Sequence, residues 1–327
     1  MKVLQIGVGR WGRNHVRAWR ALGVDLQLCD SDASLLEGFE EPTSTDAFAA
    51  LETVDAVDIA TPAPSHAKLA SAALELGKDV FVEKPLTDDS VSAFELAEEA
   101  TRRGAILQVG HIFRFAPAIQ AATSLLREGR IGEPHLAVAE FASFKRPRSD
   151  GGAAISDGIH LVDLTSWLLG RQPVAVQAAL RDTLGRGLDD VAFLALDYGD
   201  TLVHVQTSFF HPRPRRGIEL VGSEGALRCD LLEDPAAVEL FVQRHRRGED
   251  GQWTAESDPP ERIARPEEEP LRSELQAFVA ACQTRRPSAI AADGYAGACA
   301  VRVIERAQQA AGSGATLAID LPEAPAS

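Results

Sequence analysis

A histidine between two acidic residues is the first group in the sequence whose residue types and spacing could do chemistry. Asp157, His160 and Asp163 follow one another at intervals of three, so adjacent members share one face of a helix. The dipole at a helix start favours a neutral imidazole, and a neutral imidazole can take a proton from a substrate hydroxyl as a general base. The alternative is structural, because Asp157 or Ser156 would be a good helix N-cap. We expect His160 and Asp157 to be catalytic and Asp163 to lie on the substrate side.

Lys84 is the second candidate, because Glu83-Lys84-Pro85 stands at the carboxyl end of a short apolar run, 80–83. The chain has 28 arginines and 5 lysines, so a lysine beside a buried strand needs an explanation. Its ammonium could donate a hydrogen bond to a substrate hydroxyl or stabilise the developing alkoxide. The alternative is a strand-end lysine whose ammonium reaches water along an apolar stem.

A glycine-rich turn stands between a predicted strand and a predicted helix. In its G-x-G-x-x-G pattern the first glycine permits the tight turn, the second lets the backbone approach a pyrophosphate, and the third lets helix and strand pack closely. The helix N-terminus then offers free N–H groups and a positive dipole to the phosphates. The turn therefore predicts dinucleotide binding by Gly7, Gly9, Arg10, Trp11 and Gly12. The alternative is a glycine-rich turn without a ligand.

Asp30 ends the next predicted strand, 18 positions after Gly12. This is close to the spacing of the acid that holds the adenosine ribose diol in dinucleotide-binding sheets. The segment 30–34 has no Arg or Lys to receive a 2′-phosphate, and a carboxylate would repel one. NAD is therefore favoured over NADP as the cofactor. The alternative is that Asp30 or Asp32 caps the helix that follows.

Short apolar runs alternate with helical patterns over residues 1–118. Buried strands are predicted at 2–8, 24–30, 56–60, 80–83 and 105–110, and helices at 11–22, 65–76 and 88–103. This α/β alternation is typical of a doubly wound parallel sheet, whose ligands bind at the carboxyl ends of the strands. The glycine turn, Asp30 and Lys84 all stand at such ends, so the sheet would bring them to one edge.

Residues 119–327 differ, because their strands follow one another with few helices between them. After a helix at 117–127, strands are predicted at 135–143, 174–181, 191–198, 201–208, 218–221 and 226–230. The link at 198–201 is a hairpin signal, so we expect an α+β domain on a mostly antiparallel sheet. Between 233 and 270 we predict a surface loop and an edge strand. Helices at 271–282 and 295–310, which could pack back on the first domain, and a strand at 316–321 would follow.

Composition limits the class of protein. A length of 327 residues suits two domains with a sizeable core, and the formal charge of −15 argues against non-specific binding to nucleic acid or an anionic membrane. No signal peptide or membrane span is expected from the sequence. The cysteines have no C-x-x-C or metal-ligand spacing: Cys29, Cys229, Cys282 and Cys299. We therefore expect a cytoplasmic protein without a metal.

Taken together, these segments resemble the Gfo/Idh/MocA family of oxidoreductases. The resemblance spans nearly the whole chain and is carried by IGVGRWGRNHVR (6–17), ATPAPSH (60–66), VFVEKPL (80–86), VGHIFRFAP (109–117) and DGIHLVDL (157–164). It implies an N-terminal Rossmann domain, 1–118, and a C-terminal α+β domain, 119–327. The large open sheet of that second domain often forms an oligomer interface in the family, so a homodimer or homotetramer is expected.

The resemblance also implies residue roles. Lys84, His160 and an acid near Asp157 would act on a sugar or polyol. The nicotinamide side would be lined by Thr61, Pro62, His66, Glu83 and Lys84, and the substrate side by His111 and Arg114. The Lys84–Pro85 peptide is often cis in the family.

The acid departs from the family pattern. Many members carry it four residues before the histidine, where this chain has Ser156. Either the helix start is shifted and Asp157 substitutes, or His160 and Lys84 act without it.

The opening segment and 109–115 look most like the branch that oxidises nucleotide sugars such as UDP-N-acetylglucosamine at the 3-position. Two basic clusters, 145–148 with Arg146 and Arg148 and 213–216, would then neutralise a diphosphate or a uronic acid, unless they are solvated loops. We predict an NAD-dependent oxidoreductase that transfers a hydride between a sugar hydroxyl carbon and nicotinamide. The alternatives are an inositol or free-sugar dehydrogenase and a non-catalytic dinucleotide-binding sensor.

Overall fold

The computed structural model describes residues 1–233, 237–264 and 268–324, and the chain divides into two units. Unit 1 contains Met1–Phe115, Glu269–Arg302 and the described residues from Leu321, and unit 2 contains Ala116–Glu268 and Val303–Asp320. The predicted second domain, 119–327, differs from unit 2 because Glu269–Arg302 belongs to unit 1.

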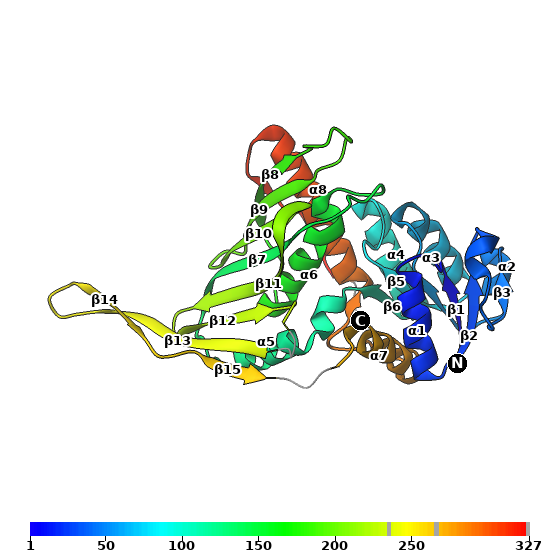
Figure 1. Ribbon diagram of the computed structural model, residues 1–327, viewed down its shortest axis with the longest axis horizontal. Coiled ribbons are helices and arrows are strands. Elements are labelled where there is room, and N and C mark those ends of the chain that lie inside the picture. The colour runs from blue at the N-terminus through cyan, green and yellow to red at the C-terminus, as the bar shows by residue number, and fades with distance from the viewer. Residues whose placement is uncertain (234–236, 265–267, 325–327) are drawn as a thin grey trace. The chain divides into compact units, whose positions relative to one another are not determined.

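Parallel strands build the sheet of unit 1. They are β1 (Lys2–Ile6), β2 (Asp25–Cys29), β3 (Thr43–Ser44), β4 (Ala56–Ile59), β5 (Asp79–Glu83) and β6 (Leu107–Gly110). With the short β16 (Ala292–Asp293) antiparallel to β6, the described strands lie in the order β16-β6-β5-β4-β1-β2-β3 (Figure 1). The predicted doubly wound parallel sheet is therefore confirmed. Its switch point, where ligands of such sheets bind, lies between β1 and β4.

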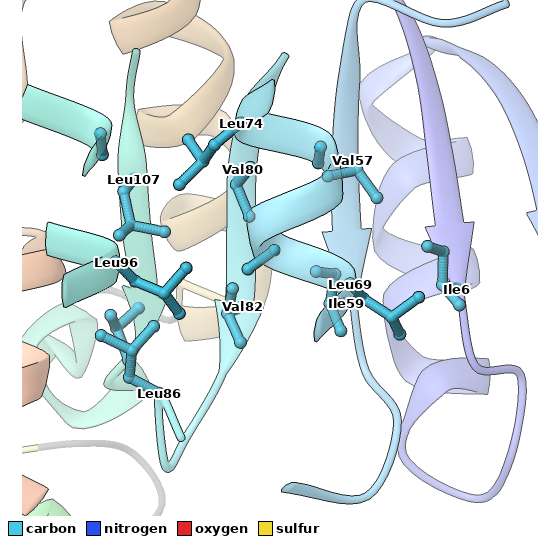
Figure 2. Packing of buried hydrophobic residues seen from close by; sticks show 14 of the residues in the cluster. Ile6, Val57, Ile59, Leu69, Leu74, Val80, Val82, Leu86, Leu96 and Leu107 are labelled. Carbon is cyan, nitrogen blue, oxygen red and sulfur yellow. The ribbon is translucent and has the colours of Figure 1, made fainter. Parts of the chain in front are cut away.

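Helices cover both faces of this sheet. They are α1 (Gly12–Leu22), α2 (Ala47–Leu51), α3 (His66–Glu75), α4 (Ser90–Arg103) and α7 (Pro270–Thr284), with 3₁₀ turns η1 (Ala33–Leu36), η2 (Ala63–Ser65) and η3 (Ile112–Phe115). On one face, α3 and α4 pack against strand residues such as Ile6, Ile59 and Val82 (Figure 2). On the other, Trp19 of α1 meets Phe278 of α7 with ring centroids 6.5 Å apart. Because α7 supplies this second layer, it belongs to unit 1.

A mostly antiparallel sheet carries unit 2, as predicted. Its strands are β7 (Pro134–Phe144), β8 (Ala175–Arg181), β9 (Val191–Asp197), β10 (Leu202–Ser208), β11 (Phe210–Gly222), β12 (Gly225–Asp230), β13 (Ala237–Arg247), β14 (Trp253–Ser257), β15 (Glu261–Ala264) and β17 (Leu317–Ala318). The order is β14-β13-β12-β11-β7-β10-β9-β8-β17, with β15 also on β13 (Figure 1). Among the described pairs, β7 and β10 are parallel and the others antiparallel.

Three helices complete the described part of unit 2: α5 (Pro117–Arg127), α6 (Ile159–Leu169) and the second half of α8 (Gly294–Ser313). A π-helical turn, η4 (Ala154–Gly158), leads into α6. With 20 residues α8 is the longest helix of the described chain, and no described helix is long and apolar enough to cross a membrane.

The stretch 233–270 is more regular than predicted. Instead of a surface loop and one edge strand it contains β13, β14 and β15, with 234–236 and 265–267 outside the described residues. Val238 and Leu240 of β13 are buried, and this period-two signal is short and followed by a run of charges. Because of these charges, the sequence did not indicate β13 as a strand that pairs with β12 inside the sheet.

One face of the unit 2 sheet is exposed. Ala137, Val203 and Leu194 are buried on the helix side, whereas Leu136 and Leu202, directly opposite each other in β7 and β10, are 40% and 61% exposed. The predicted homodimer or homotetramer through this sheet stays a prediction, and these exposed apolar side chains are the feature in its favour.

Candidate active site

The glycine turn between β1 and α1 has the geometry of a dinucleotide cradle. A Cβ at Gly7, whose φ is +94°, would lie 2.7 Å from the Ala60 carbonyl oxygen, and one at Gly12 would lie 2.0 Å from the Gly7 carbonyl oxygen. A Cβ at Gly9 would meet nothing within 4 Å. The first and third glycines therefore let the chain pack closely, while the second faces open space that a pyrophosphate could fill. Gln5 braces the turn by donating from Nε2 to the carbonyls of Gly7 and Gly12 at 3.0 and 2.7 Å.

The N-terminus of α1 has features that favour binding of an anion. Within the described chain, the N-cap residue Trp11 makes no side-chain cap, and no acidic residue lies in the first turn. The positive end of the helix dipole therefore faces the cradle, with no acidic side chain in the first turn of α1 to offset it. Arg10 beside them is exposed. These residues fit a dinucleotide phosphate.

The sequence offers two roles for Asp30 and Asp32, which are binding the ribose and capping the helix that follows. Asp32 caps η1 by accepting from the Ser34 backbone N–H at 3.0 Å. Asp30 accepts from the Val8 N–H at 2.9 Å through Oδ2 and from the Asp32 N–H at 3.0 Å through Oδ1. Its carboxylate is thus fixed beside the glycine turn, where it has acceptor capacity left for a hydroxyl. The ribose contact stays a prediction.

Glu83, at the end of β5, is tied to the glycine turn. Its Oε1 accepts from the Trp11 indole N–H at 2.8 Å and lies 3.1 Å from His15 Nε2. Its Oε2 accepts from the backbone N–H of Lys84 at 3.2 Å. Burial opposes ionisation, but the hydrogen bond and charge of His15 hold the pKa of the Glu83 carboxyl below its usual range. Glu83, the residue before Lys84, is therefore a carboxylate with hydrogen-bond partners on both oxygens.

His15 is a fully buried residue between two carboxylates. Its Nδ1 lies 2.8 Å from Asp58 Oδ2, which also accepts from the Trp19 indole N–H at 2.6 Å. Burial alone would lower the pKa of the imidazole, but Asp58 and Glu83 outweigh it and raise that pKa to about 10. His15 is thus an imidazolium at neutral pH.

His66 links two of the loops predicted to line the nicotinamide side. Its ring nitrogens lie 2.8 Å from the carbonyl oxygens of Pro85 and Thr61, and the Lys84–Pro85 peptide is cis. Burial lowers the pKa of His66, so it is neutral and donates to one of the two carbonyls. Pro62 next to Thr61 is exposed on the same loop.

His111 and Arg114 follow β6, the neighbour of β5. Both are buried, at 1% and 6% exposure. The Arg114 guanidinium donates to the backbone carbonyls of Ile290 and Ala291 at 3.4 and 3.2 Å, and so holds the segment that leads into β16. The predicted substrate contacts of these two residues stay predictions.

In unit 2, the loop before β9 fixes the start of the histidine helix. The carboxylate of Asp189 accepts from the Ala154 N–H at 2.8 Å, and its carbonyl accepts from the Ala153 N–H at 2.8 Å. A Cβ at Gly152 would lie 1.9 Å from Asp189 Oδ1, so a glycine is required there. The π-helical turn that follows accommodates one more residue than an α-turn, and such turns are frequent at functional sites.

The Phe141 ring on β7 has three polar neighbours. Lys145 Nζ lies 4.5 Å and Arg216 Cζ 4.2 Å from its centroid, and the His160 ring lies 6.3 Å away. Asp157, 5% exposed, pairs with Lys145 at 2.6 Å between Oδ2 and Nζ. The sheet therefore gathers a histidine, an acid and two cations around one aromatic ring.

The remaining predicted residues of unit 2 have varied surroundings. Ser156 and Asp163 are buried, at 4% and 3% exposure. Arg148 donates to the Asp150 carboxylate through Nε and Nη2 at 2.8 and 2.6 Å, whereas Arg146 is exposed. Asp150 thus already balances the charge of Arg148. In the described ranges, no cluster of His, Cys, Asp and Glu could hold a metal ion.

The sequence alone did not point to several residues of the site whose partners are distant in the chain. His15, Asp58 and Asp189 were not singled out, and Lys145 was grouped with a phosphate cluster rather than with Asp157. A signal was present for Asp58, because a carboxylate inside the apolar run 56–60 requires a buried partner. The Gly151-Gly152 pair was a similar signal for a close approach.

Comparisons with known proteins cover both units. Residues 1–111 match the family described as "Oxidoreductase family, NAD-binding Rossmann fold", and residues 119–228 match the "GFO/IDH/MocA C-terminal domain". The chain is 30% identical over 309 residues to UDP-N-acetylglucosamine 3-dehydrogenase of Acidithiobacillus ferrooxidans, which covers 91% of this chain and 93% of that protein. It is 31% identical over 278 residues to D-apiose dehydrogenase of Paraburkholderia graminis, covering 78% of this chain and 72% of that protein.

Two solved structures extend the similarity. The Acidithiobacillus ferrooxidans enzyme, GnnA, has a TM-score of 0.82 at 26% identity, over 96% of this chain and 98% of that one. GenD2 from gentamicin A biosynthesis, solved in complex with NAD, has a TM-score of 0.82 at 25% identity, over 98% and 96% of the two chains.

The glycine geometry predicts opposite effects for two substitutions. Gly12→Ala should lower the Tm by about 4 °C or more, because the new Cβ meets a backbone oxygen that cannot move away. Gly9→Ala should leave the Tm unchanged and weaken NAD binding about tenfold or more, since its Cβ enters the cradle. Thermal unfolding and calorimetric titration with NAD measure the two effects. Equal losses of Tm in both variants would show that our account of the turn is wrong.

The charge of His15 predicts a pH dependence of stability. A group whose pKa rises on folding stabilises the protein fully below its ordinary pKa of 6.5, and this stabilisation is lost as the pH rises toward about 10. Between pH 7.5 and 8.5 the free energy of unfolding should fall by about 1.4 kcal/mol from this group. His66, whose pKa is lowered, acts below pH 6.5, outside this window. Urea unfolding measures the slope, and ring NMR signals of His15 that titrate below pH 8 would contradict the assignment.

Proposed function

Because the chain belongs to the GFO/IDH/MocA family of oxidoreductases, we propose that it is an NAD-dependent dehydrogenase that oxidises a hydroxyl group of a nucleotide sugar. The observation that carries the proposal lies at the carboxyl edge of the unit 1 sheet. The Gly9 cradle follows β1 and Lys84 follows β5, and parallel strands bring both ends to the same edge. The oxidoreductase class also agrees with the two family matches.

The protein's residues divide the work of alcohol oxidation. The glycine turn and Asp30 would hold NAD, and the bound cofactor would supply the acceptor for the hydride that leaves the carbon of the reacting hydroxyl. His160 takes the hydroxyl proton as general base, and the Lys84 ammonium donates a hydrogen bond that stabilises the developing alkoxide. Asp157 and Lys145 form an ion pair in the polar cluster around Phe141. We assign to Asp157 the role of holding that cluster in place for His160.

The nucleotide sugar is supported by one relative that is similar in both sequence and structure. UDP-N-acetylglucosamine 3-dehydrogenase of Acidithiobacillus ferrooxidans matches over 91% of this chain in sequence, and its solved structure has a TM-score of 0.82. Oxidation at the 3-position, of UDP-N-acetylglucosamine or its uronic acid, is the specific form of the proposal. The exposed Arg146 is the guanidinium that we assign to the diphosphate. The second candidate, an inositol or free-sugar dehydrogenase, is supported by the matches to D-apiose dehydrogenase and to inositol 2-dehydrogenase 2 of Saccharopolyspora erythraea.

Activity on a panel of substrates tests the proposal. With NAD, turnover of UDP-N-acetylglucosamine should exceed that of inositol and free sugars, and UDP should inhibit competitively. His160→Ala and Lys84→Met should each lower kcat about 100-fold or more, and His160→Ala should keep the Kd for NAD within about threefold of the native value. NADH absorbance and calorimetric titration measure the two quantities. A His160→Ala variant with native turnover would contradict the assigned base, and competitive inhibition by free sugars but not UDP would favour the second candidate.

Asp30 predicts the choice between NAD and NADP. Its carboxylate lies beside the turn and would repel a 2′-phosphate, so kcat/KM should favour NAD by about tenfold or more. Asp30→Asn retains an oxygen for the Val8 N–H but removes the charge and the acceptor for the Asp32 N–H, so it should raise kcat/KM for NADP and lower the Tm slightly. Native preference for NADP, or an unchanged ratio in Asp30→Asn, would contradict this assignment.

A further inference from the structure

Four neighbouring strands carry buried polar residues on the face of the unit 1 sheet under α1 and α7. These are Gln5 on β1, Asp58 on β4, Asp79 and Glu83 on β5 and Gln108 on β6. Buried polar atoms require partners: the two glutamines donate to backbone carbonyl oxygens, and Asp79 accepts from the Arg285 guanidinium. Asp58 and Glu83 instead share His15. This face is therefore organised around a charge, although an apolar residue would pack there at lower cost.

The three charged groups form a row from the centre of the sheet to its carboxyl edge. Asp58 lies 2.8 Å from one ring nitrogen of His15, and Glu83 lies 3.1 Å from the other. Since His15 uses both nitrogens, its ring orientation is fixed, and it fixes Glu83 in turn. Trp19 completes the inner end of the row by donating to Asp58.

Trp11 completes the outer end. It is the N-cap residue of α1, a position where tryptophan is unfavourable, and it makes no side-chain cap. The residue as a whole is 43% exposed, yet its indole N–H reaches the buried Glu83 carboxylate at 2.8 Å. The residue type at this position is thus explained by the bond to Glu83 rather than by the helix end.

The backbone around Glu83 leaves its carboxylate little freedom. A Cβ at Gly110, on the neighbouring strand β6, would lie 2.9 Å from Oε1, so only a glycine leaves room for the carboxylate there. The other oxygen accepts from the Lys84 N–H. A displacement of Glu83 would therefore be passed directly to the backbone of Lys84.

We propose that Trp11 and His15 are positioning residues for Lys84: through the Glu83 carboxylate, they hold the strand end that carries the lysine in a fixed place relative to the turn that receives the dinucleotide. Trp11 belongs to that turn and His15 to the helix it starts. The inference rests on the catalytic role proposed for Lys84. A merely structural role would affect stability and leave Lys84 unchanged.

A matched pair of tryptophan variants separates positioning from stability. Trp11→Phe removes the indole N–H that reaches Glu83, and Trp19→Phe removes the one that reaches Asp58 at the remote end of the row. Both keep an aromatic ring. Glu83→Gln removes the charge of the carboxylate that Trp11 and His15 both contact. It serves as the second variant if Trp11→Phe fails to fold.

The first measurement needs no substrate or cofactor. Trace labelling of the protein with trinitrobenzenesulfonate, read by peptide mass spectrometry, compares Lys84 with the other four lysines of the chain as internal references. A released Lys84 samples more solvent, so its relative labelling should rise about threefold or more in Trp11→Phe and stay native in Trp19→Phe. Native labelling of Lys84 in both Trp11→Phe and Glu83→Gln, or an equal rise in both tryptophan variants, would overturn the inference.

The second measurement connects the positioning to turnover. In Trp11→Phe, kcat at saturating NAD should fall about tenfold or more, whereas Trp19→Phe should lower Tm and leave kcat unchanged. If Lys84→Met abolishes turnover but Trp11→Phe keeps the native kcat, the inference fails and the proposed function stands. If the native protein turns over no sugar while Lys84 is released in Trp11→Phe, the proposed function fails and the positioning stands.

Discussion

The close approach of α1 to β1 is the constraint on which the rest of unit 1 depends. At Gly12 the helix backbone lies so near the Gly7 carbonyl that a Cβ would be 2.0 Å from its oxygen. This contact sets where the helix begins and in which direction its first turns face. One turn later the helix presents His15 to Asp58 and Glu83. A glycine required by packing therefore determines where a buried charge lies.

In unit 2, an aromatic ring rather than a backbone contact determines where the buried charges lie. Phe141 is buried in β7, and the cation–π contacts of Lys145 and Arg216 hold two charges at the ring beside which His160 lies. Asp157 then has a cation at 2.6 Å, which accounts for the low exposure of its carboxylate. Burial lowers the pKa of Arg216, and the nearby carboxyl group of Asp157 opposes that shift by favouring the charged guanidinium.

Features set by local spacing could be predicted from the sequence, and features set by distant partners could not. The glycine pattern, the strand before Lys84 and the helix through His160 each depend on a few consecutive residues, and the fold class follows from their alternation. The partners of His15 lie 43 and 68 positions away. The spacing to His160 pointed to Asp157, but the ion pair of Asp157 with Lys145 depends on how β7 lies against the π-helical turn. For the same reason β13 was missed, because its buried face becomes visible only once β12 lies beside it.

The indole of Trp11 gives the protein a fluorophore at the dinucleotide turn. The chain has four tryptophans; Trp19 is fully buried, whereas Trp11 is partly open to solvent with its N–H on an ionised carboxylate. Indole emission responds both to hydration and to the electric field of nearby charges. The position that links the turn to Lys84 therefore also converts a change at the α1 N-terminus into an optical signal, without any label added to the chain.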